Sequence, residues 1–173
     1  MNALTLGPLE LVADEWIIGD SAARKGKYLK LHDQGFGYWV EGVEVQVIPW
    51  RRLMNLHLSA QPGRLGNSKA LARFTDFSMA LGGFSRLGGG EAFVAATLRH
   101  PYEDWVAYFT HAPRRYGRQE IRKVDEFLKR TVECGRAARL GDPQWVGEAV
   151  AKIAGLAGGS RDVAAAVGAI VKA

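Results

Sequence analysis

The sequence contains one cysteine, Cys134, among its 173 residues. A lone cysteine excludes an internal disulfide and the structural zinc sites that several cysteines form. No apolar run approaches the roughly 18–20 residues that a membrane-spanning helix needs. The first residues also lack the basic start and the apolar core of a secretion signal. We therefore expect a cytoplasmic chain without a membrane span.

Hydrophobic residues make up 47% of the chain and charged residues 24%. This mixture argues against a disordered chain and is sufficient for one globular core. The net charge is +5, and its position along the chain is uneven. Residues 1–110 carry 11 basic and 11 acidic side chains, residues 111–140 carry nine and four, and residues 141–173 carry three of each. The excess therefore lies in residues 111–140, a segment that can attract nucleic acid, anionic lipid or an acidic protein face.

Short apolar stretches between turn signals predict strands over most of the first 110 residues. In order, they cover residues 4–12, 16–18, 28–31, 36–40, 43–47, 56–58, 92–98 and 105–110. Glu41 and Gly42 fit the two-residue loop of a β-hairpin. Residues 43–47 alternate strictly between valine and a polar residue, which predicts a strand with one buried and one exposed face.

Helical spacing replaces this pattern towards the C-terminus. One apolar stripe, which predicts a long helix over about residues 117–140, consists of Ile121, Val124, Leu128 and Val132. Asp142 and Pro143 are typical of the start of a second helix, and we expect Ser160 to cap a third. Another helix is expected at residues 67–81.

Together these elements predict an α+β fold. It consists of an antiparallel, strand-rich sandwich or barrel that is capped by the long helix and followed by a short helical tail. Residues 1–140 would form the domain, with its strands in residues 1–110. Residues 141–173 would form a helical extension that packs on this domain or on a partner.

A short motif links this pattern to a known family. Ile48-Pro49-Trp50-Arg51-Arg52-Leu53, followed by Arg64-Leu65-Gly66, resembles an Ile-Pro motif of the bacterial pleckstrin-homology-like (PH-like) family. The resemblance implies a curved, two-sheet sandwich over roughly residues 1–140, closed at one end by the long helix. Domains of this architecture bind lipids, bind proteins or act as scaffolds, so the fold alone does not fix a function.

The catalytic motifs that the sequence approaches are all incomplete. Gly83-Phe84-Ser85-Arg86-Leu87 has leucine where a nucleophile elbow has its second glycine. Residues 19–27 place too many residues between their glycines for a phosphate-binding loop, and no His-Glu-x-x-His occurs. We therefore predict no cofactor, and catalysis only from a site whose residues are dispersed in the sequence.

The nearest approach to a metal site is a group of histidines and carboxylates around residue 100. His100 and Asp104 lie in an expected hairpin loop, whereas His111 lies at the far end of the returning strand. Because a hairpin of this length separates them, we interpret Asp104 as a turn-capping residue and expect no metal.

Two clusters of basic residues are candidates for anion binding. The larger cluster lies just before and at the start of the long helix and consists of Arg114, Arg115 and Arg118. No acidic residue lies between Arg114 and Glu120. The smaller cluster, in an expected turn, consists of Arg24, Lys25 and Lys27. The rest of the helix alternates in charge at spacings of four residues, which is typical of a solvated helix face with internal ion pairs.

Three functional hypotheses follow from these observations. The leading one is a non-catalytic interaction module that binds a protein partner or a second copy of itself. The second is an anion-binding module for nucleic acid or acidic lipid, which would use the cluster at residues 114–118. The third is an enzyme with a dispersed site.

Overall fold

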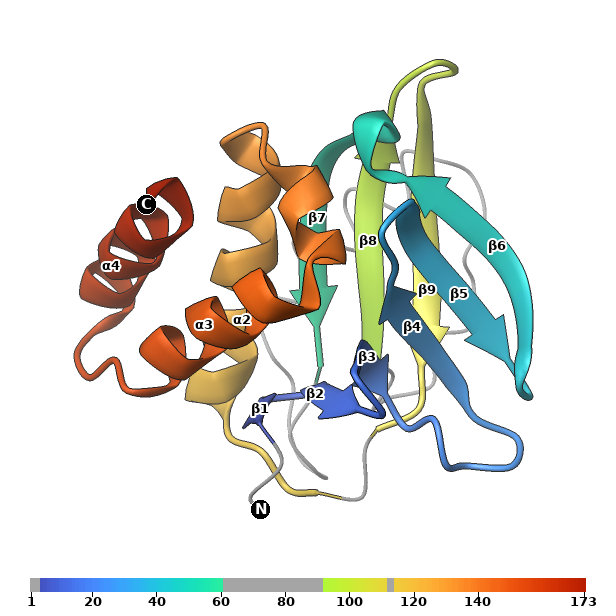
Figure 1. Cartoon of the computed structure of the whole chain (residues 1–173), viewed down its shortest axis with the longest axis horizontal. Helices are drawn as coiled ribbons and strands as arrows, with labels where there is room; N and C mark the ends of the chain where they lie inside the picture. The colour runs from blue at the N-terminus through green and yellow to red at the C-terminus, as the bar shows by residue number, and fades with distance from the viewer. Residues whose placement is uncertain (1–3, 61–91, 112–113) are drawn as a thin grey trace, which may run out of the picture.

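The structure is a computed structural model, and it describes residues 4–60, 92–111 and 114–173. In this part of the chain, antiparallel sheets of six and three strands face each other, and three α-helices lie together beside them (Figure 1). The predicted α+β class is confirmed, and the two sheets form an open sandwich rather than a closed barrel. The expected helix at residues 67–81 and the Arg64-Leu65-Gly66 segment lie outside the described residues.

The larger sheet is a meander in which each strand pairs with the next along the chain. Its strands are β1 (Thr5–Leu6), β2 (Leu9–Val12), β3 (Glu15–Gly19), β4 (Lys27–Leu31), β5 (Gly35–Val40) and β6 (Val43–Pro49). The single stretch expected at residues 4–12 is divided by a turn at Gly7, whose φ of +58° suits glycine. The predicted hairpin loop at Glu41 and Gly42 is confirmed, since both residues have positive φ.

The smaller sheet contains β7 (Leu53–Ser59), β8 (Ala92–Leu98) and β9 (Glu103–Phe109). The chain passes to it from β6 through a short 3-10 helix, η1 (Trp50–Arg52). Just after β9 the chain returns to the larger sheet, where the N–H of Thr110 donates to the carbonyl of Lys27 over 2.8 Å. One corner of the sandwich is therefore fastened by backbone hydrogen bonds.

Both sheets bury their inner faces in one shared core. Phe36 and Ile48 come from the larger sheet, and Leu56 comes from the smaller one; each is at most 1% exposed. Trp105 reaches across from β9, and its indole N–H donates to the Oε1 atom of Gln46 over 2.8 Å. This hydrogen bond satisfies the only polar group that the indole brings into the core.

The long helix, α2 (Arg118–Glu133), packs along β7 with its predicted apolar stripe buried. It ends at Glu133, so the expected extension to residue 140 is wrong. Gly135 has a φ of +71°, and the N–H groups of Gly135 and Arg136 donate to the carbonyls of Val132 and Thr131. This is the Schellman pattern that terminates a helix at a left-handed residue. The chain continues as a 3-10 helix, η2 (Ala137–Gly141).

The tail forms α3 (Pro143–Ala154) and α4 (Ser160–Lys172). As predicted, Asp142 caps α3, because its carboxylate accepts hydrogen bonds from two N–H groups of the first turn. The N-cap of α4 is Gly159 rather than Ser160, which is the first helical residue. Both helices pack against α2, and α4 buries three valines there, Val163, Val167 and Val171. The tail is therefore part of the same body. No helix in the described ranges combines the length and apolar character needed to span a membrane.

Candidate functional site

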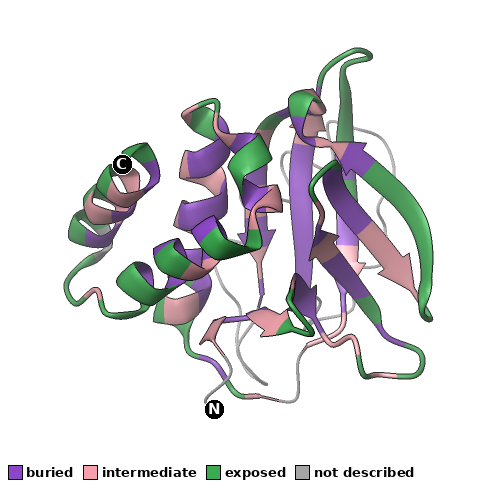
Figure 2. Ribbon diagram, in the orientation of Figure 1, coloured by how far each residue is buried: buried purple, intermediate pink, exposed green. Residues whose placement is uncertain are grey.

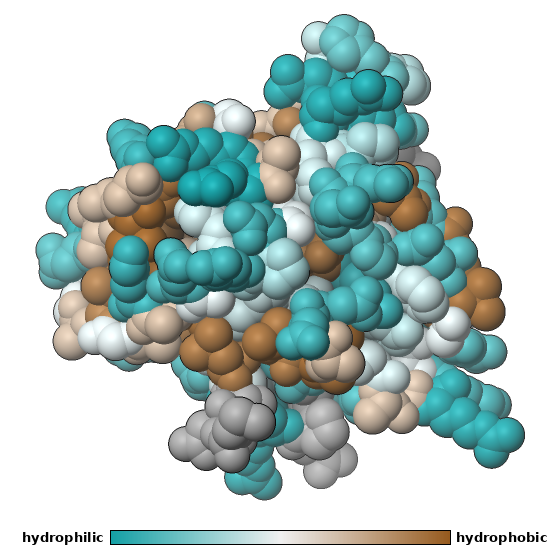
Figure 3. Space-filling view, viewed as in Figure 1, coloured by the Kyte–Doolittle hydropathy of each residue, from teal (hydrophilic) through white to brown (hydrophobic). Residues whose placement is uncertain are grey.

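The two most exposed apolar side chains on the described strands, Val43 and Val45, lie on β6, at the margin of the larger sheet. Val43 is 64% exposed, Val45 55% and Val47 39%, and Figure 2 shows exposed residues along most of this strand. The prediction that residues 43–47 bury one face is therefore wrong. In Figure 3, hydrophobic atoms accordingly lie along the margin of the molecule that carries β6.

A β-bulge explains why the alternating pattern does not produce a buried face. Tyr38 on β5 lies opposite Gln46, whereas the next residue, Trp39, lies opposite Glu44. Val45 therefore has no residue opposite it on β5. The bulge adds local twist, and only the part of β6 next to η1 reaches the core, where Ile48 is 1% exposed.

Beyond the bulge, a contact between an imidazole and a carboxylate fastens β6 to the outer face of the sheet. The Nε2 atom of His32, just after β4, lies 2.9 Å from the Oε1 atom of Glu44. The pair spans Gly37 on β5, where a Cβ atom would lie 2.6 Å from the imidazole and 2.7 Å from the carboxylate. The absence of a side chain at Gly37 thus provides the space that the pair occupies.

The backbone of β6 is paired on one side only within the described residues: β5 is its single neighbour in the sheet. Of the other sheet edges, β1 has two residues, and β7 is covered by α2. β9 carries one exposed valine, Val106, and is followed by the hydrogen bonds of Thr110 to the larger sheet. β6 therefore combines a free strand edge with the largest group of exposed valines.

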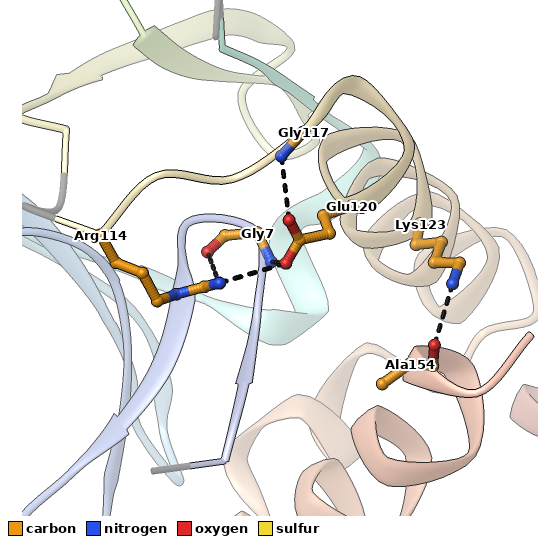
Figure 4. Close-up of polar contacts among 6 residues, drawn as sticks. All are labelled: Gly7, Arg114, Gly117, Glu120, Lys123 and Ala154. Atoms are coloured by element: carbon orange, nitrogen blue, oxygen red, sulfur yellow. Dashed lines mark hydrogen bonds and ion pairs between the residues drawn. The ribbon is translucent and has the colours of Figure 1, made fainter. Parts of the chain in front are cut away.

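Arg114, the first residue of the predicted basic cluster, has an internal partner (Figure 4). Its guanidinium donates to the carbonyl of Gly7 over 2.7 Å and to the Oε1 atom of Glu120 over 3.3 Å. Glu120 also accepts the N–H of Gly117 over 2.9 Å, as in a capping box. Arg114 and Glu120 thus form a clasp between the β1–β2 turn and the start of α2.

The clasp holds an ionised carboxylate. Partial burial opposes ionisation of Glu120, but hydrogen bonds from the backbone of Gly117 and Gly7, and from the guanidinium of Arg114, outweigh it and lower its pKa. The N-terminus of α2 therefore already has its anion, which is a side chain of the same protein. Arg114 therefore contributes to the fold, and its part in anion binding stays a prediction.

The remaining residues of the two basic clusters are exposed. Arg115 and Arg118 lie on the surface at the start of α2, Arg24 and Lys25 lie in the turn between β3 and β4, and Lys27 is the first residue of β4. In Figure 1 both segments lie on the lower side of the molecule, although no hydrogen bond or ion pair joins their side chains in the described part of the chain. Tyr116, between the arginines, is 8% exposed and therefore offers no open ring for stacking.

The predicted metal candidates do not converge. His100 is exposed in the loop between β8 and β9, but Asp104 lies on β9 itself, so its expected place in the loop is wrong; its carboxylate accepts a hydrogen bond from the hydroxyl of Thr97 over 3.0 Å. His111 lies at the other end of β9, where its ring contacts Tyr116. No group of three metal-ligating side chains occurs within residues 4–60, 92–111 and 114–173.

Comparison with known proteins finds no matching family model, no matching curated protein and no matching solved structure.

Proposed function

We propose that this protein is a non-catalytic interaction module that binds another protein by accepting an extended segment along the free edge of β6. The observation that supports this function is the exposure of Val43, Val45 and Val47 on a strand whose outer edge has no partner in the described structure. The resemblance to PH-like domains, some of which bind proteins, is compatible with it and remains a hypothesis.

Strand addition would use both the unpaired backbone groups of this edge and its exposed valines. An incoming strand supplies partners to the outward N–H and C=O groups of β6, and its side chains cover the valines. A strand edge that is free and apolar promotes unwanted pairing, and proteins normally blunt such edges with charges, bulges or covering elements. Here β7 is covered by α2, whereas no described element covers β6; its bulge and Glu44 limit pairing, but its valines stay exposed. This difference favours β6 as the edge kept for a partner.

An extended peptide tests the proposal on the full chain. The probe is a seven-residue peptide of alternating threonine and valine, added while amide exchange is followed residue by residue. We expect slower exchange at β6, and we expect the double variant Val43→Lys/Val45→Lys to abolish this protection. The matched control is Val106→Lys, because Val106 is an exposed valine on β9. Protection that is unchanged in the double variant, or absent from β6, would overturn the proposal.

A second candidate function rests on the exposed arginines at the start of α2. Arg115 and Arg118 have no ion-pair partner among the described residues, and anions bind such positions with an affinity that falls as salt rises. The test is binding to short oligonucleotides and anionic vesicles at low and physiological salt. Tight binding at physiological salt that Arg115→Glu/Arg118→Glu abolishes would rank this function first.

A further inference from the structure

The β5–β6 hairpin differs in charge from the rest of the chain. Residues 33–49 contain three acidic residues, Asp33, Glu41 and Glu44, and no lysine or arginine, although the whole chain has a net charge of +5. The proposed binding edge therefore lies on an acidic element of a basic protein.

The acidic side chains are placed around the exposed edge. Glu41 is exposed in the turn that leads into β6, and Asp33 is exposed at the opposite end of β5. Glu44 lies on β6 itself, and its side chain remains 35% exposed beside His32. A segment that pairs with β6 would pass Glu44 near the start of the strand, close to Glu41 in the turn.

We propose, building on the function proposed above, that the partner of β6 is a basic extended segment of another protein, in which lysine or arginine alternates with apolar residues. Residues that lie opposite each other on paired strands share a face and have Cβ atoms about 4.5–5.5 Å apart, so a cation opposite Glu44 is stabilised. The apolar residues of the same segment cover the valines of β6.

The same charges oppose a second copy of this chain as the occupant. Two β6 strands related by a two-fold axis would bring two acidic hairpins together, which adds like-charge repulsion to the interface. Exposed ion pairs are individually weak, so we expect the three carboxylates to act mainly on the choice of partner and on the association rate. The carboxylates thus disfavour self-pairing and favour a basic partner.

Three peptides of equal length separate charge from strand addition. Each alternates valine with lysine, threonine or glutamate, and each is titrated into the full chain at low and physiological salt while the amides of β6 are monitored. We expect the lysine peptide to bind about tenfold more tightly than the glutamate peptide at low salt, and the ratio to shrink as salt screens the charges.

Charge variants of the hairpin test which residues carry this preference. We expect Glu41→Gln/Glu44→Gln to bring the affinities of the lysine and glutamate peptides within about threefold of each other, since two of the three carboxylates are removed. The matched control is Glu133→Gln, a change at the exposed C-terminal end of α2 that should keep the wild-type preference. A thermal melt of each variant establishes that it is folded.

The outcomes distinguish the two proposals. If all three peptides protect β6 equally, strand addition stands and the inferred basic partner is wrong. If no peptide protects β6, both proposals fail. If the free chain is dimeric by light scattering with β6 already protected, the occupant is a second copy and the basic partner is again wrong.

Discussion

The carboxylate of Asp125 on α2 accepts a hydrogen bond from the backbone N–H of Leu58 on β7 over 2.8 Å. The imidazole of His57, the preceding residue, lies 3.6 Å from the same oxygen. A helix side chain therefore occupies a backbone donor that an additional strand would otherwise use. Together with the packing of α2, this contact closes β7 to strand addition, whereas within the described residues β6 pairs on one side only.

Removal of this carboxylate should weaken the fold. We expect Asp125→Ala to lower the free energy of unfolding by about 1–2 kcal/mol, because the N–H of Leu58 loses its acceptor at a partly buried position. Asp125→Asn keeps an acceptor and should cost less. Urea denaturation measures both, with Gln119→Ala, an exposed change on the same helix, as the control. Equal stability of Asp125→Ala and the control would contradict this role.

The clasp of Arg114 and Glu120 predicts a stability that depends on pH. The pKa of Glu120 is lowered in the folded state, so its contribution is complete above the ordinary value of 4.5 and is lost as pH falls through the lower folded value. We therefore expect the stability difference between the wild type and Glu120→Gln to narrow over this acidic range. Denaturation curves at several pH values measure it, and a difference independent of pH would count against the clasp.

The raised pKa of Tyr116 predicts that the stability of the fold also changes at high pH. Burial raises its pKa from the ordinary value of 10 to about 12, although the nearby Arg114 acts in the other direction. In the unfolded chain this tyrosine ionises first, so stability should fall as pH rises from 10 towards 12. We expect Tyr116→Phe to reduce this loss. The control is Tyr102→Phe, because Tyr102 is 73% exposed; a loss of equal size in both variants would contradict the prediction.

The two glycines at positions 135 and 168 should respond in opposite directions to alanine. At either position an added Cβ atom would have no other atom within 4 Å, so only the backbone distinguishes them. Gly135 has a φ of +71°, and Gly135→Ala should destabilise by about 1 kcal/mol. Gly168 lies inside α4, and Gly168→Ala should stabilise by up to about 1 kcal/mol. Thermal denaturation of the two variants should shift the midpoint in opposite directions, and a common direction would refute the explanation.

The elements with strong local signals could be predicted from the sequence. The buried stripe of α2 could be predicted from the spacing of its apolar residues alone. The start of α3 could be predicted because Asp142 and Pro143 are neighbours in the sequence. The predicted end of α2 lies too late in the chain because both Gly135 and Gly141 are possible stops. The earlier glycine is the one that ends the helix, and only its backbone conformation shows that it is left-handed.

The features of the candidate site depend on contacts between distant residues. Alternation in residues 43–47 does not reveal the bulge opposite Tyr38 and Trp39, which disrupts the pairing of the part of β6 where Val43 and Val45 are exposed. Likewise, the sequence around Arg114 does not show its partner Gly7, which is 107 residues away. Glu120 follows three residues after Gly117, at the spacing of a capping box, and this is the local signal that the start of the helix has an internal anion.

The arrangement of helices and sheets also determines how the protein can be attached to a surface. The C-terminus follows α4, at the opposite end of the longest axis of the molecule from β6 (Figure 1). Ala173 is exposed there. A biotin or a flexible linker at this residue would orient the whole molecule with the valines of β6 towards the solution, far from the support. Immobilised protein would in that geometry meet a soluble partner without steric hindrance from the sensor surface.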